Sequence, residues 1–166
     1  MDAVVRPIAD QFRLNTDLLL NCLDGMSDAE RLFRPASGIN HAAYLTAHLI
    51  DTRYFLATLL GAATDNPLAP LLAQAKCLDD VPDLPSSGEL ASAWEAIGRH
   101  LDRAFAELTP EELERATPQR LPGSDGTLCG GIAFLLQHES YHLGQIALLR
   151  RMLGHPAMSY RRREVR

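Results

Sequence analysis

Apolar residues recur at three- and four-residue steps in four long segments of the chain, at residues 3–23, 40–60, 86–108 and 128–153. This spacing places the apolar side chains on one face of an α-helix. Gly25, Gly61 and Gly154 follow the first, second and fourth segments, where glycine commonly ends a helix. No segment alternates apolar and polar residues as a half-buried strand does, and there is no internal repeat. The pattern predicts an all-α four-helix bundle.

The connection between the second and third predicted helices is long and rich in proline. Because it contains Pro67, Pro70, Pro82 and Pro85, we expect at most a short helix there, near residues 71–76. Ser86, followed three residues later by a glutamate, is typical of a capping box that opens the third helix. Residues 109–116 begin with Thr-Pro-Glu-Glu and predict one or two helical turns. The bundle therefore has one long crossover.

The composition is that of a soluble globular protein. The chain has 166 residues, of which 46% are hydrophobic and 22% charged, and we expect residues 1–166 to form a single domain. The net charge of −5 gives no basic footprint for nucleic acid. The longest apolar runs fall far short of the roughly 20 residues that a membrane helix needs. We therefore expect neither nucleic acid nor a membrane as a partner.

Cysteine usage and the N-terminal residues indicate a cytoplasmic protein. Cys22, Cys77 and Cys129 are odd in number and widely separated, with no C-x-x-C pair, which suits a reducing compartment. Charged residues such as Arg6 interrupt the N-terminal segment, which lacks the apolar region of a signal peptide.

Three histidines are the candidates for chemistry. His138 and His142 are one helical turn apart, near the middle of the apolar arc of the fourth predicted helix. His48 lies within the apolar arc of the second. Each neutral imidazole has one donor and one acceptor nitrogen, and burying either without a partner costs free energy. Three histidines that face one interior therefore need polar partners there.

Two explanations supply these partners. A backbone carbonyl, a hydroxyl or a water could satisfy each ring separately, as is usual for a lone buried histidine. A divalent cation would satisfy all three rings at once, at about 2.0–2.1 Å for zinc, and we favour this explanation. Three protein ligands leave one open coordination position, which is the arrangement of catalytic sites. Zinc, nickel, iron and manganese are the candidate metals.

The segments around these histidines, HESYHLGQI at residues 138–146 and HAAYLTAHL at residues 41–49, are distinctive. They resemble the fourth and second helices of the DinB/YfiT-like family, and helix order and spacing extend the resemblance over essentially the whole chain. The resemblance implies a four-helix bundle with up-down-down-up topology. It also implies a metal site built from one histidine of the second helix and an H-x-x-x-H pair of the fourth. Carried over, these ligands are His48, His138 and His142.

The same resemblance implies a function. Characterised relatives include bacillithiol- and mycothiol-dependent S-transferases and a mycothiol-dependent isomerase, and a homodimer is the family's common state. A bound cation would take a low-molecular-weight thiol cosubstrate in its open position and stabilise the thiolate as a nucleophile. Water in that position would instead give a hydrolase. The alternative from another class is a bundle that binds a metal or a small ligand without catalysis.

Other residues compete for these roles. His41 precedes His48 by seven residues, about 10 Å along the same helix face, as an alternative ligand or a residue near the site mouth. Residues 138–142 also match H-E-x-x-H, in which Glu139 would be the general base of a metalloprotease. The lack of a predicted strand and of a downstream third ligand argues against that reading. We expect Glu139 and Asp51 on the flanks of their helices, outside the apolar arcs.

Four arginines, Arg161, Arg162, Arg163 and Arg166, form a short basic tail at the C-terminus. The tail could contact an anionic partner or be solvated. The net charge of −5 over the whole chain favours the solvated state.

Overall fold

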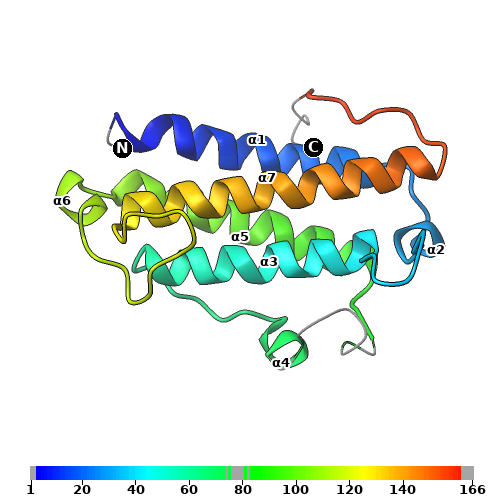
Figure 1. Ribbon diagram of the computed structural model, residues 1–166, viewed down its shortest axis with the longest axis horizontal. Coiled ribbons are helices and arrows are strands. Elements are labelled where there is room, and N and C mark those ends of the chain that lie inside the picture. Colours follow the sequence, from blue (N-terminus) through cyan, green and yellow to red (C-terminus); the bar gives the residue numbers. More distant parts are fainter. Residues whose placement is uncertain (1–2, 74, 76–80, 82, 162–166) are drawn as a thin grey trace.

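The computed structural model describes residues 3–73, 75, 81 and 83–161, and four long helices dominate it (Figure 1). They are α1 (Val5–Leu23), α3 (Ala42–Leu59), α5 (Ser87–Glu107) and α7 (Leu128–Met152), each within two residues of its predicted bounds. Within the described ranges there is no β-strand, and Ala116 and Thr127 form one isolated bridge. The prediction of an all-α bundle is therefore confirmed.

The helices pack so that each has two neighbours. α1 packs against α7 and α5, and α3 packs against the same two helices. Figure 1 shows α1 and α7 running toward the end of the bundle that carries α2 (Asp28–Arg31). α3 and α5 run toward the end that carries α6 (Pro110–Leu113). The crossover between α3 and α5 passes over the outer side of α3 and contains α4 (Ala69–Leu72).

The short helices follow local signals in the sequence. α4 forms about one turn earlier than the predicted helix near residues 71–76, and Lys76 lies outside the described residues. α2 was not predicted, although Ser27 and Glu30 form a capping box at its start. The predicted capping box of α5 is present, with Ser86 Oγ accepting the N–H of Glu89. After α3 the chain reverses at Gly61, whose φ of 75° suits glycine.

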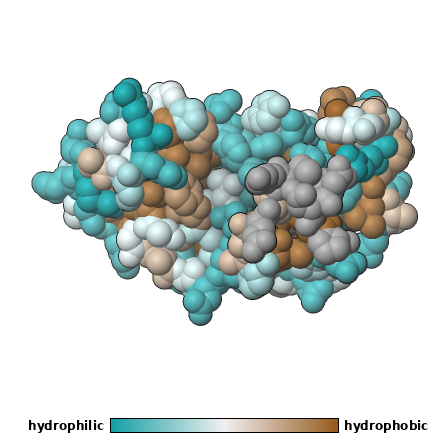
Figure 2. All heavy atoms as spheres, turned by 60° about the horizontal axis from the view of Figure 1, so that its bottom comes forward, coloured by the Kyte–Doolittle hydropathy of each residue, from teal (hydrophilic) through white to brown (hydrophobic). Residues whose placement is uncertain are grey.

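Two large apolar clusters along the bundle axis make up most of the described core. One contains Phe12 and Phe105, whose ring centroids are 5.4 Å apart, and the other contains Trp94. Arg53 and Glu139, both 1% exposed, lie between the levels of these clusters along α3 and α7. Seen from the side of the crossover, the surface alternates between hydrophilic areas and smaller hydrophobic ones (Figure 2).

The chain after α7 returns along the end of α1. Arg150 donates hydrogen bonds to the backbone oxygens of Cys22 and Pro156, and the Sγ of buried Cys22 lies 3.3 Å from the Sδ of Met158. Burial raises the pKa of the Cys22 thiol to about 11. Of the predicted basic tail, Arg161 is exposed, and Arg162, Arg163 and Arg166 lie outside the described residues. No helix in the described ranges has the length and apolar character required to span a bilayer.

Candidate metal centre

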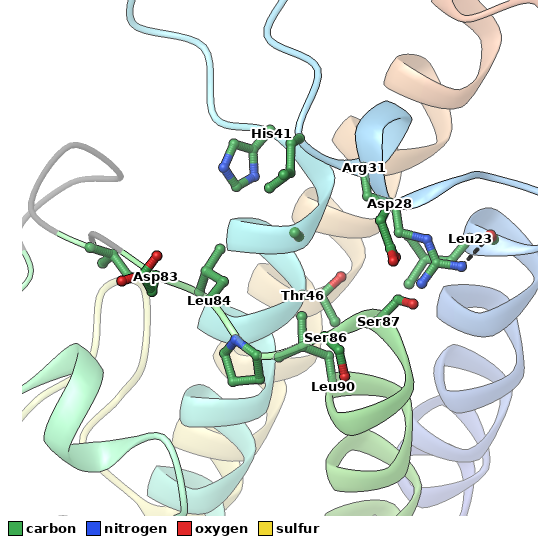
Figure 3. A pocket seen from close by; sticks show the side chains of 14 residues that line it. Leu23, Asp28, Arg31, His41, Thr46, Asp83, Leu84, Ser86, Ser87 and Leu90 are labelled. Atoms are coloured by element: carbon green, nitrogen blue, oxygen red, sulfur yellow. Dashed lines mark hydrogen bonds between the residues drawn. The ribbon is translucent and has the colours of Figure 1, made fainter.

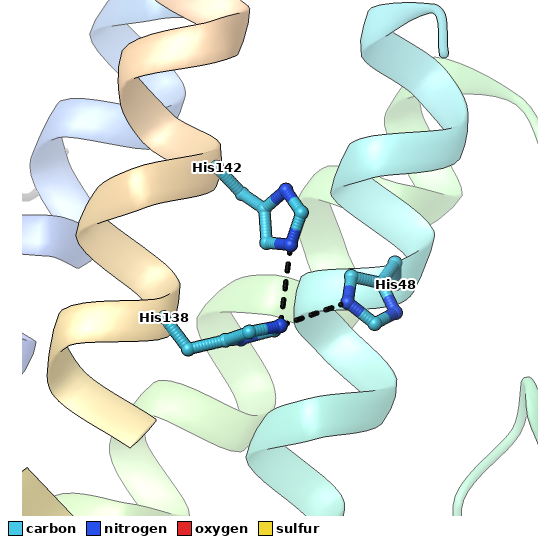
Figure 4. A group of neighbouring side chains, drawn as sticks. All are labelled: His48, His138 and His142. Atoms are coloured by element: carbon cyan, nitrogen blue, oxygen red, sulfur yellow. Dashed lines mark hydrogen bonds between the residues drawn. The ribbon is translucent and has the colours of Figure 1, made fainter. Parts of the chain in front are cut away.

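The structure brings the three predicted histidines together across the contact between α3 and α7 (Figure 4). The Nε2 atom of His138 lies 3.2 Å from Nε2 of His48 and 3.2 Å from Nε2 of His142. One ring nitrogen from each histidine lies within 4.8 Å of the other two. Two helices thus direct three imidazole nitrogens toward one point.

These separations fit a divalent cation. In a tetrahedral site with Zn–N bonds of 2.0–2.1 Å, two ligand nitrogens lie about 3.3 Å apart. The two measured separations of 3.2 Å are close to that value. The His138 Nε2 atom contacts two ring nitrogens, but a proton on it would point to only one of them. One cation, by contrast, can accept the lone pairs of all three rings.

The protonation states of the rings also suit metal binding. Burial, helped by the neighbouring histidines, lowers the pKa of His48 to about 4. Burial and the proximity of His142 also lower the pKa of His138. Both rings are therefore neutral at pH 7, as a metal ligand must be.

Gln145 fixes the third ring. Its Oε1 lies 2.8 Å from Nδ1 of His142, so the amide oxygen accepts the Nδ1–H and leaves the Nε2 lone pair facing the cluster. Nδ1 of His138 is buried without a hydrogen-bond partner in the described part of the chain. Nε2 is therefore the atom through which the His138 ring meets polar groups.

The sequence matches the profile of the DinB superfamily over residues 11–146. The chain belongs to the DinB superfamily. The crystal structure of a DinB-like protein, YjoA from Bacillus subtilis, at 2.30 Å resolution has a similar fold, with a TM-score of 0.68. The two are 17% identical, and the match covers 95% of this chain and 99% of that one, so the likeness concerns the fold. A comparison with curated proteins finds no match.

The histidines of this DinB-superfamily bundle lie nearer its surface than the sequence indicated. They were expected near the middle of the apolar arcs, but all three are half-buried. The centre of the buried face of α7 is instead occupied by Leu135, Glu139 and Leu143. The cluster therefore lies at the edge of the core, partly exposed to solvent.

Aromatic rings surround the cluster. The ring of Tyr44 stacks beside His48 at a centroid distance of 6.4 Å, and that of Phe134 lies 6.1 Å from His138. Tyr141, which is 57% exposed, lies 5.0 Å from the ring of His142. The surroundings of the site are thus largely aromatic.

His41 does not join the cluster. It is the N-cap of α3, and its Nδ1 accepts the N–H of Tyr44 at 3.0 Å. Its ring lines a separate cavity of about 290 Å³ at the α2 end of the bundle, together with Arg31, Thr46 and Ser87 (Figure 3). The group of histidines that could hold a metal ion therefore includes His48 and not His41.

The prediction that Glu139 lies on the flank of its helix is wrong. It is 1% exposed, and both carboxylate oxygens accept hydrogen bonds of 2.8 Å from the guanidinium of Arg53. Leu135, Glu139 and Leu143 are spaced four residues apart, and their row, not that of the histidines, faces the core. Arg53 similarly follows Leu49 by four residues. Opposite charges at the centres of two apolar stripes are the sequence signal that indicates such a pair.

Asp51 lies on the shoulder of α3 as predicted. It is half-buried and accepts a hydrogen bond of 2.6 Å from Asn66, a residue of the crossover. Burial raises the pKa of its carboxyl group. Asp51 is not a member of the three-histidine group.

Proposed function

We propose that this DinB-superfamily protein is a metal-dependent enzyme that joins a low-molecular-weight thiol to a small electrophile. The observation that carries the proposal is the convergence of three histidine Nε2 atoms at the edge of the core. Three ligands leave a coordination position for a further one, as in catalytic sites. Zinc, nickel, iron or manganese is the expected metal.

The residues of the chain would act around the cation. His48, His138 and His142 would bind it through Nε2, while Gln145 holds the ring of His142. When bound, the cation would lower the pKa of a thiol and hold its thiolate at neutral pH. In conjugation to a haloaromatic compound, the sulfur forms a bond to the ring carbon as the carbon–halogen bond breaks. The halide leaves with the electron pair, and the thiol proton passes to water.

The aromatic neighbours favour a planar or apolar electrophile. Phe134 is half-buried beside His138. Its ring could contact a flat substrate bound at the cluster.

The test is conjugation of a panel of thiols to an activated haloaromatic compound by the untagged protein. We expect turnover that rises with metal content and is lost in His48→Ala. His155→Ala is the matched control, since that ring binds Glu30 away from the cluster. Conjugation by His48→Ala at the wild-type rate would contradict the proposal.

The alternative function is a bundle that binds a metal or a small ligand without catalysis. The same panel separates the two: about one metal per chain without turnover above the uncatalysed rate would favour this alternative. A metalloprotease-like hydrolase has less support, because both oxygens of Glu139 bind Arg53 inside the core. At 1% exposure, that carboxylate is not open to solvent as a general base would be.

We further propose that the protein forms a homodimer through the outward face of α7. Tyr141, Leu148 and Met152 are 57%, 61% and 55% exposed, and among the exposed residues of α7 only Arg151 is charged. A helix that is apolar on all sides is normally covered. On α3 the crossover supplies that cover, with Val81 packed against Tyr44. No described segment covers α7 in the same way.

A second copy fits this face because a two-fold axis pairs the stripe with itself. Gly144 lies between Tyr141 and Leu148, and a Cβ there would meet nothing within 4 Å, so two helices could approach closely. In an antiparallel pair centred on Gly144, the two Arg151 side chains lie at opposite ends, so the two positive charges do not meet.

Leu148→Glu places a charge in this interface and should convert a dimer to a monomer in analytical ultracentrifugation. Ala96→Glu, on the exposed face of α5, should not. A wild-type monomer at all concentrations would contradict the proposal.

A further inference from the structure

Arg53 makes the most extensive polar contacts in the described core. Its Nε and Nη2 atoms each donate a hydrogen bond of 2.8 Å to one carboxylate oxygen of Glu139, and both side chains are 1% exposed. This two-point contact between planar groups fixes distance and orientation together. Arg53 belongs to α3 and Glu139 to α7, the two helices that carry the clustered histidines.

The other two helices hold the same guanidinium. On α1, the Thr16 Oγ1 and Phe12 carbonyl oxygens accept hydrogen bonds of 2.9 and 3.0 Å from it. On α5, the Trp94 ring lies 3.4 Å from the guanidinium carbon, and a Cβ on Gly98 would lie 3.1 Å from Nη1. Arg53 therefore cannot move along the bundle without losing contacts to the other three long helices.

Stability alone does not explain such a pair. Removing two charges from water is costly, and well-packed apolar residues of similar volume often stabilise a core equally well. The best supported use of a buried polar pair is to fix the register of two helices, which apolar packing specifies less strictly. A slip of one residue moves a helix by about 1.5 Å along its axis.

The histidine cluster is sensitive to slips of that size. Ligand distances in a metal site tolerate deviations of only about 0.2 Å. Glu139 lies between His138 and His142 in sequence, and Arg53 follows His48 by five residues, about 7.5 Å along α3. The ion pair is therefore anchored close to the ligands that both helices contribute.

We propose that Arg53 and Glu139 are a positioning pair that sets the register of α3 against α7 and thereby the spacing of the three histidine nitrogens. The proposal deepens the proposed metal site and rests on it for its effect on binding. Its effect on spacing is independent of any metal.

The test compares the variant Arg53→Met/Glu139→Leu, which removes both charges together, with Leu101→Ala. Leu101 is 2% exposed on α5, so its substitution weakens the core without touching the pair. In Co²⁺ titrations we expect the double variant to bind at least tenfold more weakly than wild type, with a changed visible spectrum. Leu101→Ala should keep the wild-type affinity and spectrum, although urea unfolds it at a lower concentration.

A crystal structure of the metal-free double variant supplies the second measurement. We expect the Nε2 atoms of His48 and His138 to lie farther apart than 3.2 Å. An unchanged separation, or unchanged Co²⁺ affinity and spectrum, would overturn the positioning role. If wild type itself binds no Co²⁺, the proposed function fails, and the crystal structure still decides whether the pair sets the spacing. If the double variant does not fold, Arg53→Lys serves in both measurements, since lysine lacks the two-point contact.

Discussion

The bundle has two unlike halves, the neighbouring helices α1 and α5 and the neighbouring helices α3 and α7. The buried residues of α5 are apolar or glycine, and those of α1 are apolar except for Asn15. On the other side, α3 buries Arg53 and α7 buries Glu139 and Arg150. The outward faces are reversed as well, since α5 exposes several charged residues and α7 exposes a largely apolar stripe.

One pair of helices thus mainly stabilises the bundle, and the other pair carries the polar groups of the candidate site. α1 and α5 follow the amphipathic pattern that makes a helix stable against a core. α3 and α7 depart from it wherever a polar group has a specific partner, as at His142 with Gln145. A substitution in one half should therefore change a different property from a substitution in the other.

The largest effect is expected for His138→Ala, in the α3–α7 half. His138 Nε2 is the atom that contacts both other rings, so its loss removes the centre of the cluster. Metal content should fall from about one per chain to near zero, because two histidines remain where three or four ligands are usual. Elemental analysis of untagged protein measures this, with His100→Ala as the control. Retention of metal by His138→Ala would assign the site elsewhere.

In the α1–α5 half, Phe105→Ala should change stability alone. The ring is fully buried and packs against Phe12. Truncation leaves a cavity and should cost about 3–5 kcal/mol in the free energy of unfolding, measured with urea. Metal affinity, measured by titration of the same samples, should stay within about twofold because the cluster is built on the other helices. A large loss of affinity would show that the halves are coupled.

Acid should destabilise the metal-free protein through the α3–α7 half. The pKa of His48 is lowered to about 4, so between that pH and about 6.5 the unfolded chain binds a proton that the folded one does not. Above pH 6.5 His48 is neutral in both states and costs no stability. As the pH falls from 6.5 toward 4, protonation of His48 in the unfolded chain lowers the free energy of unfolding by something on the order of 3 kcal/mol. In urea unfolding at several pH values, the free energy of unfolding of His48→Gln should fall less steeply with decreasing pH than that of wild type. An equal pH dependence in the two proteins would contradict the assignment.

The smallest effect is expected for Gln145→Leu, which leaves all three ligands in place. Losing the amide oxygen frees the His142 ring to rotate, and such changes typically weaken metal affinity 10–100-fold. Gln137→Leu, at an exposed position of the same helix, is the matched control. Equal affinities for the two variants would mean that Gln145 does not orient the ligand.

The sequence predicted the long helices and the clustered histidines for the same reason. Periodicity and the four-residue spacing of His138 and His142 are local properties that one helix is enough to display. The capping box at Ser27 is equally local, so α2 could have been predicted by applying the rule that correctly placed Ser86.

Arg53 and Glu139 illustrate what could not be predicted in this way. From the sequence of one helix, a charged residue among leucines can be buried or can point toward solvent. It is buried only if another helix supplies a group of opposite charge to pair with it. That partner lies 86 residues away in the sequence. The half-buried state of the histidines depends likewise on the angle between α3 and α7, which neither helix determines by itself.

The packing of Cys22 has a practical consequence for any search for the substrate. A conjugation assay mixes the protein with a thiol and an electrophile, and reactive cysteines of the protein would consume the reagent themselves. Because burial raises the pKa of the Cys22 thiol to about 11, only a very small fraction of the molecules carries its thiolate at pH 7. Self-labelling at this position should therefore be negligible over an assay. Peptide mass spectrometry after exposure to the haloaromatic reagent should recover Cys22 unmodified.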